Sequence, residues 1–86
     1  MTSQNDVYLE AASLAIELRK RQRVDERHAV EAAWRALKRS ASLPSGPYME
    51  DVMRVLRDIE KGRTQATKPN PETVRRAAEE LKRLDD

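Results

Sequence analysis

The chain has 86 residues, of which 38% are apolar and 37% charged, and its formal net charge at pH 7 is +2. It contains no cysteine, which excludes disulfides, thiolate metal sites and cysteine nucleophiles. A chain of this size buries only about 60–65% of its unfolded surface. We therefore expect a single helical domain over residues 1–86, with a thin core that gains from apolar surface lent by a partner.

Neither a membrane span nor a secretory leader is indicated by the sequence. No apolar run approaches the ~20 residues that a membrane-spanning helix needs. Residues 1–6 lack the basic start and the apolar stretch of a signal peptide. Because cysteine is absent as well, we expect a cytoplasmic location and no membrane partner.

The first segment with a helical period runs from about residue 6 to residue 22 and is apolar around most of its circumference. Its polar positions, Glu10, Ser13 and Glu17, form one narrow stripe with spacings of three and four residues. A helix with so little polar surface must be enclosed on most sides. We therefore expect it to be either the central helix of the domain or an oligomer interface.

A second helix is expected over about 25–40, with Asp25 as its N-cap. Its inward face consists of Val30, Ala33, Trp34 and Leu37. We place a break near Arg23–Asp25, because the polar run over 19–23 interrupts the apolar pattern of the first segment. Neither glycine nor proline stands at that point, so one bent helix over 6–40 is the alternative.

Residues 41–47 and 63–70 are expected to be connecting loops, and the second of them is expected to be mobile. A third helix is expected between them, over about 47–61. Pro47 suits its first turn, and Gly62 is the signal that stops it.

A fourth helix is expected over about 71–84. Asn70 is its N-cap, and Pro71 stands at the first helical position. The four segments together predict an all-α fold, a compact bundle of four short helices.

The 17 lysine and arginine residues are mostly explained by helix ends and local ion pairs. Five acid–arginine pairs at i, i+4 are expected: Glu17–Arg21, Glu31–Arg35, Glu50–Arg54, Glu72–Arg76 and Glu79–Arg83. We favour this interpretation over a phosphate-binding surface. If nucleic acid binds, the candidate contacts are Arg19, Lys20, Arg21, Arg23, Arg63 and Lys68.

Residue types that support catalysis or metal binding are scarce. His28 is the one histidine, and without cysteines it cannot build a zinc site. The only glycines, Gly46 and Gly62, do not form a phosphate-binding loop. We therefore expect no enzyme activity, no metal, no cofactor and no small-molecule substrate.

The candidate protein interface is an apolar flank of the first helix together with one aromatic residue of the second: Tyr8, Leu9, Ala12, Ile16 and Trp34. Trp34 is large enough to anchor either a core or an interface, and a core position is the commoner role. If the other helices enclose the first completely, the chain is a monomer and its partner binds elsewhere. We expect one flank to stay open to a protein partner or a second copy, because the larger apolar residues make a meagre core.

Residues 55–63 (VLRDIEKGR) and 69–74 (PNPETV) resemble the closing part of lambda-repressor-like helix-turn-helix domains. Those domains often end the recognition helix with an acid, one further residue, glycine and arginine, ahead of a capped helix. The resemblance implies DNA binding. The chain departs from the pattern because residues 43–47 replace the tight turn and because the third helix carries Glu50, Asp51, Asp58 and Glu60.

The sequence thus favours a small non-enzymatic module, a regulator or adaptor, that binds a protein partner or a second copy of itself. The contact is expected to be an apolar helix face, and the role is inferred from size and class. The alternative is a small DNA-binding transcriptional regulator of the helix-turn-helix type.

Overall fold

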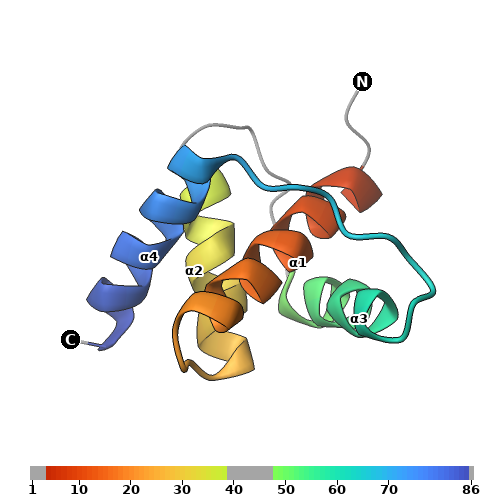
Figure 1. Cartoon of the computed structure of the whole chain (residues 1–86), viewed down its shortest axis with the longest axis horizontal. Helices are drawn as coiled ribbons and strands as arrows, with labels where there is room; N and C mark the ends of the chain where they lie inside the picture. The colour runs from red at the N-terminus through yellow and green to blue at the C-terminus, as the bar shows by residue number, and fades with distance from the viewer. Residues whose placement is uncertain (1–3, 39–47, 86) are drawn as a thin grey trace.

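The computed structural model describes residues 4–38 and 48–85 of the chain. These residues form four helices, α1 (Gln4–Arg21), α2 (Glu26–Lys38), α3 (Met49–Glu60) and α4 (Pro71–Asp85), and no strand (Figure 1). The all-α bundle of four short helices is therefore confirmed. None of the described helices is long and apolar enough to cross a membrane.

The boundaries follow the local signals closely. Residues 22–25 are not helical, so α1 and α2 are separate helices rather than one bent helix. The expected connector over 41–47 and the last expected turn of α2 lie outside the described residues. The third helix begins later than expected, at Met49, and the side chain of Tyr48 at its N-cap makes no capping hydrogen bond.

Two capping signals act as the sequence indicates. The Asn70 side-chain oxygen accepts a hydrogen bond of 2.9 Å from the Glu72 backbone N–H, which satisfies one free donor of the first turn of α4. Gly62 has a φ of +78°, the left-handed conformation that ends a helix and that glycine adopts without a steric penalty. The last turn of α3 is closed by the Arg63 N–H, which donates to the Asp58 carbonyl at 2.8 Å.

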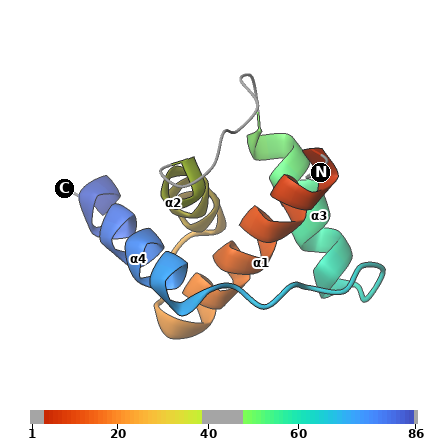
Figure 2. The same cartoon turned by 90° about the horizontal axis from the view of Figure 1, so that it is seen from above.

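Helix α1 is the central element. It contacts each of the other three helices, whereas no contact joins α3 to α4 among the described residues. Figures 1 and 2 show α3 on one side of α1 and the α2–α4 pair on the other. Helix α1 thus holds the central position that its apolar circumference predicts.

The core is built largely from alanine and a few larger aliphatic side chains. Its largest fully buried side chains are Leu14, Leu18, Leu56, Val30 and Val52. Eight alanines are fully buried beside them: Ala11, Ala12, Ala15, Ala29, Ala32, Ala33, Ala36 and Ala77. Small side chains let the helices approach closely, so a short chain encloses α1 with little bulk.

The three aromatic residues form a single stack inside the bundle. The Trp34 ring lies 4.4 Å from the Tyr48 ring, centroid to centroid, with 4° between the planes. Its other neighbour is Tyr8, at 5.8 Å and 23°. Trp34 is only 5% exposed and joins α1, α2 and the start of α3, so it occupies a core position.

Burial raises the pKa of the Tyr48 hydroxyl above its ordinary value of 10.0, and the nearby Glu31 carboxylate raises it further. The Arg35 guanidinium opposes this shift in part. Arg35 and Glu31 are themselves paired, with Nη2 and Oε1 2.9 Å apart. The folded protein therefore favours neutral Tyr48.

The loop between α3 and α4 crosses α1 and is attached to it (Figure 1). The Thr67 backbone N–H donates to Ser13 Oγ at 2.9 Å, and Ser13 Oγ donates to the Leu9 carbonyl at 2.8 Å. Ser13 is only 3% exposed, so the polar stripe of α1 is covered at its centre. The loop expected to be mobile is thus anchored at one point, by a contact between residues far apart in sequence.

We predict that Ser13→Ala lowers the free energy of unfolding by about 0.5–1.5 kcal/mol, because one hydrogen bond to the loop is lost. Amide exchange at Thr67 should accelerate in the variant, while exchange in α2 should change far less. Urea unfolding and amide hydrogen exchange measure the two effects. An unchanged exchange rate at Thr67 would show that the contact with Ser13 does not hold the loop.

We also predict that Tyr48→Phe alters the pH dependence of stability in alkali. Because the pKa of Tyr48 is raised by folding, the stabilising effect of its neutral form is fully present below about pH 10 and is lost as the pH rises through the folded-state pKa. Wild type should therefore lose stability relative to Tyr48→Phe above pH 10. Denaturant unfolding of both proteins between about pH 8 and pH 12 tests this prediction. If the free energies of unfolding of the two proteins changed in parallel with pH, the prediction would be contradicted.

Candidate functional site

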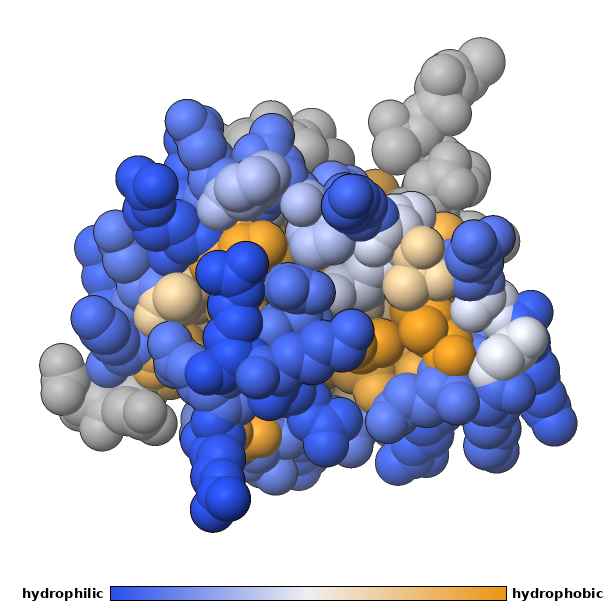
Figure 3. Space-filling model, in the orientation of Figure 1, coloured by the Kyte–Doolittle hydropathy of each residue, from blue (hydrophilic) through white to orange (hydrophobic). Residues whose placement is uncertain are grey.

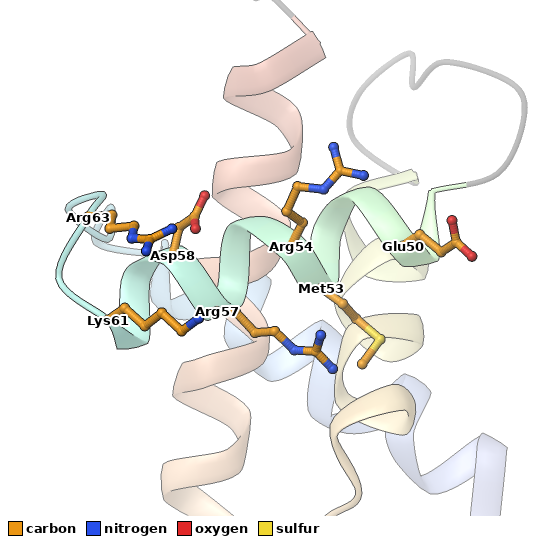
Figure 4. Close-up of a pocket in the computed structure, with 7 residues that line it drawn as sticks. All are labelled: Glu50, Met53, Arg54, Arg57, Asp58, Lys61 and Arg63. Atoms are coloured by element: carbon orange, nitrogen blue, oxygen red, sulfur yellow. The ribbon is translucent and has the colours of Figure 1, made fainter.

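The side of α3 that faces away from α1 carries a shallow groove of about 480 Å³ (Figure 4). Its lining residues, which we call the α3 groove, are Glu50, Met53, Arg54, Arg57, Asp58, Lys61 and Arg63. All except Arg63 belong to α3 or to the residue that follows it, and Arg63 stands just beyond the helix stop.

Helical spacing explains why these side chains share one face. Positions three and four residues apart lie on the same side of a helix, which brings Glu50, Met53, Arg54 and Arg57 into one stripe. On the opposite side, Val52 and Leu56 are fully buried. The core therefore fixes α3 through one face and leaves the other face to solvent.

The helix stop brings a further cation to the groove. Gly62 turns the chain with its positive φ, and the Arg63 N–H then bonds to the carbonyl of Asp58. Figure 4 shows Arg63 and Asp58 at the same end of α3. Arg63 therefore lines the groove although it lies beyond the end of α3.

The groove combines four cations and two carboxylates around one apolar side chain. Arg54, Arg57, Lys61 and Arg63 are exposed, and none of them forms an ion pair among the described residues. The expected pair of Glu50 with Arg54 is not formed, and Figure 4 shows Glu50 pointing away from Arg54. Met53 is partly buried, packs against the core and points to the same side as Arg57 (Figure 4).

Elsewhere the expected local ion pairs are formed in part. Arg21 Nε lies 3.6 Å from Glu17 Oε1, and Arg35 pairs with Glu31. Arg83 pairs with Glu80 at 3.3 Å rather than with Glu79. Within the described part of the chain, Arg76 does not pair with Glu72. Local pairing thus explains fewer of the cations than the spacing predicts.

The six candidate nucleic-acid contacts do not gather into one cluster. Arg19 Nη1 lies 3.9 Å from Glu60 Oε2, and with Lys20 and Ile16 it borders a second, smaller depression of about 280 Å³. Arg21 is paired to Glu17, and Arg23 is exposed in the turn before α2. Lys68 is exposed in the loop that crosses α1, and of the six only Arg63 lines the α3 groove.

Two of the five candidate interface residues, Ala12 of α1 and Trp34 of α2, lie in the core. Ala12 is fully buried and Trp34 is 5% exposed, so both belong to the core and are not accessible to a partner. Tyr8 and Ile16 are half-buried and pack against that core, and Leu9 is half-buried. Helices α2, α3 and α4 each contact α1, and the loop is attached to it at Ser13, so these three side chains are partly but not fully covered.

Figure 3 shows how little hydrophobic surface is left on the face drawn in Figure 1. Hydrophilic side chains cover most of this view, and its largest hydrophobic area lies where α1 meets α3. An apolar face wide enough to drive association is therefore not seen on this side.

Chemistry other than binding has little support in the described residues. His28 Nδ1 lies 3.5 Å from Asp25 Oδ2, with both side chains about half exposed, at 49% and 64%. No group of three or more His, Cys, Asp or Glu side chains that could hold a metal ion occurs in the described part of the chain. The α3 groove offers cations and a thioether, which suit recognition of an anionic partner with an apolar element.

Comparison with known protein families, curated proteins and solved structures finds nothing that matches this chain. No family match therefore supports the resemblance to helix-turn-helix domains. The residues between α2 and α3 that replace the tight turn of that pattern, 43–47, lie outside the described part of the chain.

Sequence reasoning did not single out Arg54, Arg57 or Lys61. Arg54 was assigned to a pair with Glu50 and Lys61 to the end of the third helix, and Arg57 was given no role of its own. A usable signal was present: these cations recur at i, i+3 and i+7, on the face opposite Val52 and Leu56. Comparison of the two faces of the third helix therefore indicates this charged face from the sequence.

Proposed function

We propose that this chain is a small non-enzymatic module, a regulator or adaptor, that binds a protein partner through the α3 groove. The observation that carries the proposal is a set of four exposed cations, without ion-pair partners in the described part of the chain, around a partly buried methionine. Arginine and methionine are enriched at protein interfaces, where an apolar centre is surrounded by a polar rim.

The proposal replaces the apolar flank of α1 with the outer face of α3 as the contact surface. The fold needs the apolar side chains of α1 for its own core, as the burial of Ala12 and Leu14 indicates. The α3 groove, in contrast, supplies only Met53 to the packing of the bundle. Its four cations make no ion pair with any other residue that the structure describes, and we propose that they contact another molecule.

A protein partner suits the groove better than a DNA duplex does. Glu50 and Asp58 stand among the four cations and would face phosphates at close range. The same helix carries Asp51 and Glu60, although Glu60 is paired with Arg19. A protein surface can place cations opposite these acids, whereas a phosphate backbone cannot.

We predict that the double variant Arg54→Glu, Arg57→Glu loses its protein partner while keeping its fold. Proteins that bind the chain in its source cells would be captured by crosslinking, and nuclease treatment would remove those held only through nucleic acid. A captured protein would then be identified and purified, and its Kd for the chain measured. Reversing two charges at the centre of the groove should weaken binding at least about tenfold, or about 1.4 kcal/mol. Circular dichroism checks the fold.

The matched control is Arg75→Glu, Arg76→Glu on α4, which reverses two exposed charges of the same type away from the groove. It should retain the partner. Equal loss in both variants, or retention in both, would contradict the proposal. Loss of the captured protein on nuclease treatment alone, with salt-sensitive binding of the chain to a DNA duplex, would favour the DNA-binding regulator instead.

A further inference from the structure

We infer that the occupant of the α3 groove is an acidic amphipathic helix of the partner protein, an inference that rests on the function proposed above. The mode is that of a helix lying in a groove, with an apolar anchor and charges on either side. Three features of the groove lead to this occupant: its length, the spacing of its cations and its apolar centre.

The groove is long and open along α3. It extends from Glu50 to Lys61, which is about 17 Å at 1.5 Å per residue. A partner helix of about three turns covers the same length. Because the depression is shallow, it accommodates one face of such a helix and does not enclose a small ligand.

The cations of α3 are spaced as the charges of a helix are spaced. Arg54, Arg57 and Lys61 follow at intervals of three and four residues, about 4.5 and 6 Å along the axis. Acidic residues at the same intervals on a partner helix have the same axial spacing as these three cations. Each cation can therefore pair with one carboxylate, which gives three ion pairs. Side chains on one face of an extended strand recur every ~7 Å and match this spacing less well.

The apolar centre and the two acids favour a peptide over a polyanion. Met53 is partly buried at its base and offers a flexible thioether, against which an apolar side chain packs. Glu50 stands at the start of the groove and Arg63 at the far end. An antiparallel partner helix would place its N-terminal end, where acids are favoured, beside Lys61 and Arg63, and a basic residue near Glu50.

The test uses the full chain and three labelled probes in fluorescence anisotropy. The first is a helical peptide of about 18 residues with acids at intervals of three and four and one central leucine. The second is a scrambled peptide of the same composition, and the third is a short DNA duplex. The helical peptide should bind at least about tenfold more tightly than either of the others.

Two variants separate charge from apolar contact. Arg57→Glu should weaken binding of the helical peptide at least about tenfold, whereas Arg76→Glu on α4 should change it less than about twofold. Met53→Gln removes the apolar contact without changing the charge. This variant should also bind the helical peptide severalfold more weakly than the wild type does. Circular dichroism of each variant confirms that the bundle is folded.

Equal binding of the helical and scrambled peptides, or full binding by Met53→Gln, would overturn the inference. If the peptide does not bind while the partner captured in cells still requires Arg54 and Arg57, the protein-binding role stands and the acidic helix is wrong. If the DNA duplex binds most tightly and Arg57→Glu abolishes that binding, both the inference and the proposed function fail.

Discussion

The enclosure of α1 is the constraint on which the rest of the structure depends. This helix is apolar around most of its circumference, so it is stable only when other elements cover it. The remaining helices meet that need from different sides, and no contact joins α3 to α4 in the part of the chain that the structure describes. Even the short polar stripe of α1 is covered at Ser13, where the loop before α4 donates a hydrogen bond from Thr67.

Enclosure by so short a chain has a consequence for function. Alanines fill much of the core and allow close helix packing, and most of the larger apolar side chains that the structure describes are either buried in this core or partly buried against it. The stack of Tyr8, Trp34 and Tyr48 likewise uses every aromatic ring of the chain in joining α1, α2 and α3. What remains for recognition is a charged helix face, and the outer side of α3 offers one with a methionine at its centre.

The fold followed from the sequence where local chemistry decides structure. Four helices, the break before Asp25, the cap at Asn70 and the stop at Gly62 all depend on nearby residues, and all are confirmed. Ser13 was expected in a polar surface stripe, because its contact with Thr67 is set by the course of a distant loop. The α3 groove was missed because Arg54 was assigned to Glu50, a pair that the side chains do not form.

Light scattering during size-exclusion chromatography tests the central claim, that α1 is enclosed by its own chain, most directly. An enclosed α1 leaves no wide apolar flank, so the isolated protein should be a monomer of 9.9 kDa over a broad range of concentration. A stable dimer that Ile16→Glu converts to a folded monomer would contradict the account, because it would show that the flank of α1 is an open interface after all.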